Sequence, residues 1–378
     1  MEEILPLPMP DRRIINNKDN NYEHSKFQKK DNNNNESTKK KTELKFNKLK
    51  KSKLSNISTA QIKQIEDMRQ KIMSYKLLSD KTIYINSFLN NTKIEKCNII
   101  IFGPSGVGKS SFIHSLYISL YNTYVLPSQL INNIIIRKKN HNESTLLFSQ
   151  YHLVKETENN SGIMICDTNG NLKMNDNEKE QYKIILDGQL KDCSQIEKNA
   201  NKDRNSLLDF WKKSNELFPK EIFKSDISQG NIRSLPHCVV FVFDGSIDEI
   251  IQNEDIKYYQ NLIWISKEKG YKDIHVILSK LDEFEKKVWE RNKNLTENEI
   301  YNKLKVMKDI KIEKVISILG VNRSNVHFIE NYHLNKQNKN SVEIDYNILK
   351  TIVDILYSSE LFIIDKTNRK QECFGFCI

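Results

Sequence analysis

The sequence predicts an α/β fold in which helices cover both faces of a mainly parallel central sheet, giving three α/β/α layers. Apolar runs of strand length alternate along the chain with segments of helical periodicity, a pattern typical of parallel sheets. The run HCVVFVFD at 237–244 is apolar almost throughout, as in a strand that is buried on both faces. A glycine-rich turn joins the strand-like run 97–102 to the helical segment 111–121.

The individual elements follow from hydrophobic periodicity. Ile62, Ile65, Met68 and Ile72 recur every three or four residues and predict a helix that begins near Ser58, with Ser58 or Thr59 as its cap. The other expected strands are 145–154, 161–167, 274–280 and 325–331, and the other expected helices are 258–270, 298–320 and 346–358.

Composition divides the chain of 378 residues into segments. Residues 1–57 are rich in Asn and Lys and lack apolar periodicity, so we expect a disordered tail. An N-terminal helical segment is expected over 58–94 and one large domain over 95–365, with a helical and loop insert at 172–235. Residues 366–378 are expected to form a flexible C-terminal tail.

The formal net charge of +10 does not indicate a nucleic-acid groove. The tail 1–57 carries 14 Lys or Arg and 8 Asp or Glu, a net of +6, which leaves only +4 for the remaining residues. The basic character therefore belongs mostly to the tail, and no specific nucleic-acid partner is expected. Contact of the tail with an anionic membrane surface is left open.

Cysteine usage and hydropathy favour a cytoplasmic protein. The six cysteines have no CxxC spacing, which argues against a zinc or thioredoxin-like site. The sequence has no secretory h-region and no apolar run long enough to span a bilayer. We therefore expect reduced thiols and no transmembrane segment.

The strongest motif is GPSGVGKS at 103–110, which fits G-x-x-x-x-G-K-[ST] between a strand and a helix. Its glycines allow a tight turn that directs several N–H groups at one anion, and the helix that follows adds its positive end. Lys109 would reach the outer phosphates and Ser110 would bind Mg²⁺. The motif predicts a P-loop NTPase whose phosphate contacts are Gly103, Pro104, Ser105, Gly106, Val107, Gly108, Lys109, Ser110 and Ser111.

A second motif favours guanine over adenine. SKLD at 279–282 is close to the N/T-K-x-D pattern, in which the Asp carboxylate accepts two hydrogen bonds from guanine. Asp282 would read the base, because adenine lacks that pair of donors, and the aliphatic stem of Lys280 would lie along the base. Ser279 keeps the hydroxyl of the usual Thr. Asn331 ends a later strand, where a short loop would direct N–H groups at the base.

The metal and the switch residues are sought in the segments between these motifs. CDTNG at 166–170 ends a strand in D-x-x-G, so Asp167 would contact Mg²⁺ through water and the Gly170 N–H would approach the γ-phosphate. Asp244 also follows an apolar strand and is the rival for the metal, although a strand-end cap explains it better. HNESTLLF offers the hydroxyls of Ser144 and Thr145, and Thr145 is chosen as the switch residue that contacts Mg²⁺, with a turn-forming hydroxyl as an equal explanation.

Two residues would govern hydrolysis. Lys109 would stabilise charge on the transferred phosphoryl group. Asn171 occupies the position at which small GTPases carry a water-orienting Gln, and it is shorter by one methylene. We therefore expect GTP hydrolysis to GDP to be slow or to depend on a partner.

Taken together, these motifs resemble the interferon-induced protein 44-like family of P-loop GTP-binding proteins, over roughly 68–362. The stretches that carry the resemblance are RQKIMSYK (69–76), GPSGVGKSSF (103–112), CDTNG (166–170), DGQLKD (187–192), LPHCVVFVFDGS (235–246) and ENYH (330–333). The resemblance implies a cytoplasmic GTP-binding protein with a role in immune or stress responses. The Asn/Lys-rich tail, Ser279 and Asn171 depart from the family pattern.

The sequence thus favours a slow or partner-dependent GTPase switch that uses GTP/GDP and Mg²⁺. One alternative is a P-loop ATPase or kinase, which the SKLD motif and Asn331 disfavour. Another is an adaptor that is stabilised by bound nucleotide and does not turn over. The expected partners are a guanine nucleotide and a protein, either an effector or a second copy of the chain.

Overall fold

The computed structural model describes most of the chain between Ser58 and Gly375. The chain divides into two units, Met1–Ser55 and Asn56–Ile378, and every described residue belongs to the second. The described ranges are 58–78, 94–127, 149–168, 182–183, 185–188, 232–333 and 341–375.

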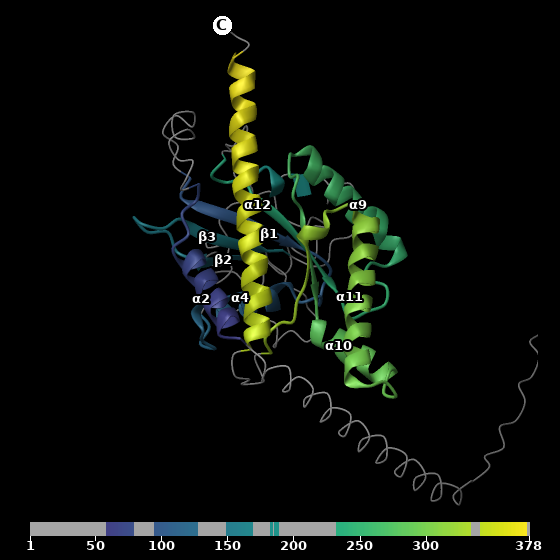
Figure 1. Cartoon of the computed structure of the whole chain (residues 1–378). Coiled ribbons are helices and arrows are strands. Elements are labelled where there is room, and N and C mark those ends of the chain that lie inside the picture. The colour runs from purple at the N-terminus through teal and green to yellow at the C-terminus, as the bar shows by residue number, and fades with distance from the viewer. Residues whose placement is uncertain are drawn as a thin grey trace, which may run out of the picture. The chain divides into compact units, whose positions relative to one another are not determined.

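The second unit is built on a six-stranded sheet with the order β2-β3-β1-β4-β5-β6 (Figure 1). The strands are β1 (Lys96–Phe102), β2 (Ser149–Val154), β3 (Gly162–Asp167), β4 (Cys238–Asp244), β5 (His275–Ser279) and β6 (Val326–Phe328). All neighbouring strands are parallel except β2 and β3, which run antiparallel with a bulge between His152 and Val154. The predicted α/β fold with a mainly parallel sheet is confirmed.

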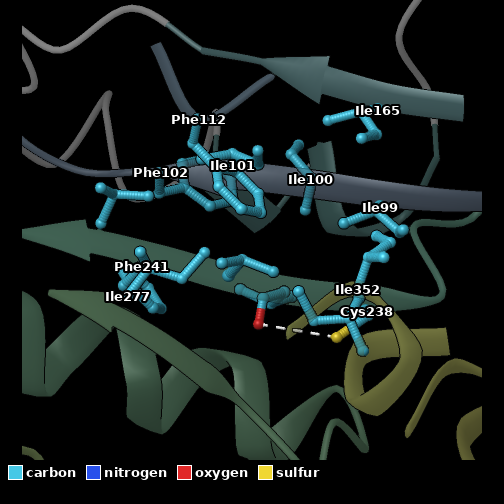
Figure 2. Close-up of a cluster of buried hydrophobic side chains, with 14 of the residues drawn as sticks. Ile99, Ile100, Ile101, Phe102, Phe112, Ile165, Cys238, Phe241, Ile277 and Ile352 are labelled. Atoms are coloured by element: carbon cyan, nitrogen blue, oxygen red, sulfur yellow. Dashed lines mark hydrogen bonds between the residues drawn. The ribbon is translucent and has the colours of Figure 1, made fainter. Parts of the chain in front are cut away.

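Helices pack on both faces of this sheet. They are α2 (Thr59–Met73), α4 (Lys109–Tyr121), α9 (Asn253–Glu268), α10 (Leu281–Arg291), α11 (Glu297–Leu319) and α12 (Val342–Gly375). Alternate side chains of β4 point to opposite faces. Phe241 and Phe243 pack edge-to-face on Tyr259 of α9, whereas Cys238 lies beside Ile352 of α12 (Figure 2). Helices α2 and α4 contact α12 and therefore share its face, and α11 contacts α9.

The core lies along β1 and its neighbours (Figure 2). Ile99, Ile100 and Ile101 are consecutive and are each at most 1% exposed, because β1 is covered on both faces. Burying each of these side chains contributes about 1.5–3 kcal/mol. Phe112 of α4 and Ile165 of β3 close the same cluster. This rigid centre fixes where β1 ends and the phosphate loop begins.

Helix α2 begins where the sequence predicts. Ser58 caps it through a capping box, in which its side chain accepts a hydrogen bond from the N–H of Gln61 while the Gln61 side chain returns one. Ile65 and Ile72 are buried as expected. Ile62 lies in the first turn of the helix, which is exposed, and is itself 54% exposed.

Strand β6 ends at Phe328 and not at Asn331, where the strand expected over 325–331 would end. Two helices also differ from the sequence expectation. Helix α10 was not predicted, although Leu281, Phe284 and Val288 have helical spacing and form a small separate core with Ile300 and Leu304 of α11. The helix starts immediately after β5 and leaves no linker that would signal it.

The second difference is helix α12, which continues to Gly375, into the segment 366–378 that the sequence analysis expects to be a flexible tail. None of the helices within the described ranges is both long and apolar enough to cross a membrane.

The order of the strands in the sheet indicates where a ligand would bind. After β1 the chain continues to β2 and β3 on one side of β1, whereas β4 lies on the other side. Ligands of open α/β sheets bind beyond the carboxyl ends of the strands at such a reversal of strand order. The ends of β1, β3, β4 and β5 all meet at this edge.

Candidate functional site

The loop between β1 and α4 has a backbone that only glycine tolerates at several points. Gly103, Gly106 and Gly108 have φ values of 144°, 75° and 98°. A Cβ atom on Gly103 would lie 2.1 Å from the carbonyl oxygen of Val242 in β4, so the loop is packed directly on the neighbouring strand. The sequence therefore specifies a tight turn against the sheet.

The loop leads straight into the N-terminus of α4. The cap residue is Gly108, and it offers no side chain to the first N–H groups of the helix. Ser105 and Gly106 at the tip are exposed, while Val107 anchors the loop in the core. Unsatisfied N–H groups and the helix dipole at this point form a site for an anion.

Lys109 is the first residue of α4, and its ammonium group lies over the loop. The side chain is buried at 5% exposure, and Nζ donates hydrogen bonds to the carbonyl oxygens of Gly103 at 2.8 Å and Pro104 at 2.9 Å. The ammonium group is therefore held at the rim of the turn by carbonyl oxygens of the loop itself. Its positive charge adds to that of the anion site. This position suits contact with an outer phosphate.

Ser110 and Asp167 meet at the ends of α4 and β3. The Ser110 hydroxyl donates a hydrogen bond to the Asp167 carboxylate, which is fully buried. Thr168, the next residue, donates its hydroxyl to the Ile101 carbonyl at 2.8 Å and ties the end of β3 to β1. The structure thus brings together the serine and the D-x-x-G aspartate that the sequence assigns to the metal.

This pair of oxygen donors fits Mg²⁺. Mg²⁺ prefers hard oxygen ligands and is usually held by one or two protein groups, with phosphates and water completing the octahedron. Within the described ranges, no group of three or more His, Cys, Asp or Glu side chains is placed to hold a metal ion. A cation bound at Ser110 and Asp167 would therefore depend on the phosphates of a ligand.

Asp244, the rival metal residue, has other partners. Its Oδ1 accepts hydrogen bonds from the backbone N–H and hydroxyl of Ser246 at 2.8 and 2.7 Å, and its Oδ2 accepts one from Lys280 at 2.6 Å. Burial opposes ionisation, but the hydrogen bonds from Lys280 and Ser246 outweigh it and hold the pKa of Asp244 below its ordinary value. The carboxylate caps the turn after β4, as the sequence interpretation favoured.

The SKLD motif begins at the end of β5 and touches the phosphate loop. Ser279 is fully buried, and its hydroxyl contacts the carbonyl oxygens of Val107 and, at 3.1 Å, Phe243. Lys280 adopts a left-handed conformation with φ 60° at the start of α10, which turns the chain so that its ammonium reaches Asp244. The serine that departs from the usual motif thus fastens this motif to the loop.

Asn331, which lies on the loop after β6, is close to the same end of the phosphate loop. It is 9% exposed, and within the described residues its buried Oδ1 has no hydrogen-bond partner. A Cβ atom on Gly108 would lie 3.1 Å from Asn331 Nδ2 and 3.6 Å from Ser279 Oγ. The end of the phosphate loop, the SKLD motif and the Asn331 loop therefore converge at one place.

Asp282 and His333 form the outer side of this place. Asp282 lies in the first turn of α10, and its Oδ2 is 3.1 Å from His333 Nε2. Sequence reasoning did not single out His333, although ENYH contains it two residues after Asn331. Three predicted residues, Thr145, Gly170 and Asn171, lie outside the described ranges.

His237 has a structural role, as the sequence interpretation expected. Its Nδ1 accepts a hydrogen bond from the Asn98 backbone N–H at 3.0 Å, and its Nε2 lies 2.8 Å from the Ile232 carbonyl oxygen, to which it donates. Burial lowers the pKa of His237 to about 4, against the opposing effect of the Ile232 carbonyl. Both ring nitrogens are used to join β1 to the segment before β4.

Comparison with known proteins gives no family. No protein-family model and no curated protein matches the chain, so the resemblance to the interferon-induced protein 44-like family gains no support from them. Solved structures with a similar fold include Toc33 from Arabidopsis thaliana in complex with GDP and Mg²⁺, at 14% identity over 76% of this chain and 95% of that chain, with a TM-score of 0.35.

Two further likenesses are weaker in coverage. The S. cerevisiae Ski7 GTPase-like domain, bound to GDP and inorganic phosphate, matches at 12% identity over 72% of this chain and 52% of that chain, with a TM-score of 0.34. A septin GTPase domain from Chlamydomonas reinhardtii matches at 16% identity over 50% and 53%, with a TM-score of 0.23. Identities and TM-scores this low do not carry a function from one protein to another.

Proposed function

We propose that this protein binds GTP and GDP with Mg²⁺ and hydrolyses GTP slowly. The observation that carries the proposal is the meeting of Gly108, Ser279 and Asn331. A phosphate-binding turn and a guanine-reading motif can bind the same ligand only if the fold brings them together. Here the hydroxyl of Ser279 in the second motif contacts the Val107 carbonyl of the turn directly. Asn331 adds a buried Oδ1 that has no hydrogen-bond partner among the described residues and that a ligand would satisfy.

The roles follow from the geometry. Residues 103–111 and the start of α4 would hold the phosphates, with Lys109 at the outer ones. Ser110 and Asp167 would hold Mg²⁺, which supplies neutralisation of charge on the phosphate oxygens. Asp282 and Lys280 would hold the guanine. For the moving part of the site, Thr145, Gly170 and Asn171 are proposed from the sequence alone.

The base preference is tested by nucleotide extraction and by competition. Denaturing the purified protein and identifying the released nucleotide gives the base and the number of phosphates. Displacement of a fluorescent GDP by GTP, but not by equal concentrations of ATP, is the expected result. Equal displacement by ATP would favour a P-loop ATPase and overturn the assignment of SKLD.

Asp282→Asn should shift the preference from guanine to xanthine nucleotides. The amide offers a donor where the carboxylate accepts, and xanthine presents an acceptor where guanine has its amino group. Losing a hydrogen bond to a charged group and leaving a donor unpaired should weaken GDP binding about 100-fold. Titration of fluorescent GDP and XDP measures both affinities.

The matched control is Asp309→Asn, which changes an exposed carboxylate on α11 that is paired with Arg323. This variant should bind GDP as the unchanged protein does. Unchanged GDP affinity in Asp282→Asn would remove Asp282 from the base site while leaving the phosphate site standing.

Slow turnover is proposed from Asn171. An amide one methylene shorter than Gln reaches less far towards the attacking water, so the intrinsic single-turnover rate should stay below about 1 s⁻¹. The measurement is release of radiolabelled phosphate from GTP with protein in excess. A faster rate without any partner would contradict the proposal, and Asn171→Gln should raise the rate if residue 171 orients the water.

Partner, location and physiological role are also proposals. A protein partner or a second copy of the chain would supply what a slow site lacks. A cytoplasmic location is proposed from cysteine usage and from the family resemblance, and a role in immune or stress responses from that resemblance alone.

A further inference from the structure

A buried carboxylate connects the N-terminal helix to the base side of the site. Asp345 lies in the first turn of α12, and its side chain is 5% exposed. Its Oδ2 accepts a hydrogen bond from Arg69 Nη2 of α2 at 2.7 Å, and its Oδ1 accepts one from the hydroxyl of Tyr332 at 2.8 Å. One carboxylate therefore joins two segments that are far apart in the sequence.

Arg69 also contacts the helix that follows the phosphate loop. Its Nε donates to the carbonyl oxygen of Ser119 in α4 at 2.7 Å. The Arg69 side chain is only 15% exposed, so its pairing with Asp345 is a desolvated ion pair and not a surface contact. Removing one partner of such a pair leaves a buried charge without compensation, which is costly.

Tyr332 is the member of this network that belongs to the site. It directly follows Asn331 and precedes His333, which contacts Asp282. Its backbone N–H donates to the hydroxyl of Ser115 in α4 at 2.8 Å. The position of the Tyr332 ring therefore decides where the groups on either side of it stand.

We propose that Arg69 and Asp345 are positioning residues for nucleotide binding, because they hold Tyr332 and so fix the Asn331–His333 loop against the base site. This inference rests on the proposed guanine-nucleotide function. It makes helix α2 a working part of the nucleotide site, although α2 itself contributes no predicted contact to the ligand. Loosening the ion pair frees the base side of the site and leaves the phosphate loop in place.

The experiment measures dissociation of fluorescent GDP from the full chain. Arg69→Gln and Tyr332→Phe should each speed release about tenfold. Both variants loosen the contact of Tyr332 with Asp345, and Tyr332→Phe also removes the acceptor of the Ser341 N–H. The double variant should therefore be no faster than Tyr332→Phe alone, and the non-additivity of the cycle is the expected signature. Arg323→Gln, which breaks an exposed pairing with Asp309 on α11, is the control and should release GDP at the unchanged rate.

A second readout separates positioning from a general loss of structure. Inorganic tripolyphosphate occupies only the phosphate loop, so its affinity should be the same in Tyr332→Phe as in the unchanged protein. Weakening of tripolyphosphate together with GDP would show a global effect and overturn the inference. Arg69→Lys keeps the charge and should recover most of the slow release, which also covers the case in which Arg69→Gln does not fold.

The outcomes for the inference and for the function differ. GDP release that is unchanged in Arg69→Gln and Tyr332→Phe, or that multiplies to about a hundredfold in the double variant, overturns the positioning role while nucleotide binding stands. Failure of the unchanged protein to bind GDP at all overturns the proposed function and the inference with it.

Discussion

Lys109→Ala is expected to abolish measurable nucleotide binding. The ammonium group is held at the rim of the phosphate loop by the Gly103 and Pro104 carbonyls, where the motif places the outer phosphates. A charge-assisted hydrogen bond in a buried site contributes about 1.5–3 kcal/mol, and Lys109 can make more than one. We expect GTP affinity to fall at least 100-fold, which corresponds to about 3 kcal/mol. Calorimetric titration with GTP and Mg²⁺ measures it.

The control for Lys109→Ala is Lys305→Ala, which removes an exposed ammonium on α11. It should leave GTP affinity unchanged and so shows that net charge alone does not decide binding. Because Lys109 also bonds the loop, unfolding is followed by circular dichroism, and Lys109→Met, which keeps most of the stem, serves if the alanine variant is unstable. Micromolar GTP affinity in a folded Lys109→Met would remove this loop from the proposed site.

Mild acid should destabilise the fold, because three histidines are buried in the neutral form. Burial lowers the pKa of His237 and His327 to about 4 and that of His275 to about 3, from an ordinary value of 6.5. The unfolded chain therefore binds protons first as pH falls below about 6.5, and stability is lost in the acid direction. Between pH 7.5 and 5.5 each buried neutral histidine should cost roughly 1 kcal/mol of unfolding free energy.

The geometry of the histidine pair shows why protonation is resisted. His275 Nδ1 lies 3.0 Å from His327 Nε2, and His275 Nε2 lies 2.8 Å from the Ser358 hydroxyl. One ring nitrogen must accept while the other donates, and two protonated rings would set N–H against N–H. Two protonated rings therefore do not fit this site, and burial disfavours the charge of even one of them.

Urea unfolding at pH 7.5 and 5.5 measures this loss. His327→Gln should reduce the difference in unfolding free energy between the two pH values by roughly 1 kcal/mol. The matched control His152→Gln changes a half-exposed histidine on β2 and should leave the difference as it was. Equal unfolding free energies at both pH values would contradict the buried neutral histidines.

Much of the fold was predictable because its signals are local. The continuous apolar runs give the buried strands β1 and β4, and the glycines at 103, 106 and 108 give the turn, since each needs a backbone angle that other residues resist. The capping box at Ser58 marks the start of α2. For such features a short stretch of sequence contains the physical cause.

Other features were not predictable because their cause is distant in the sequence. From the sequence alone, Asp345 is an ordinary acidic residue in the first turn of a helix. Only the fold brings Arg69 and Tyr332 into contact with it. Ser279 reads as a weakened motif residue, yet its hydroxyl binds the phosphate loop across the sheet. Helix α10 was hidden because it follows β5 without a linker.

The two edge strands limit how copies of this protein could associate. An open edge exposes unpaired backbone groups that can template the strand of a neighbour, and bulges and short strands are common protections. Here β6 at one edge has only three residues, and β2 at the other carries the bulge between His152 and Val154. Continuous sheets across two molecules, and the aggregation that they start, are therefore disfavoured at both described edges.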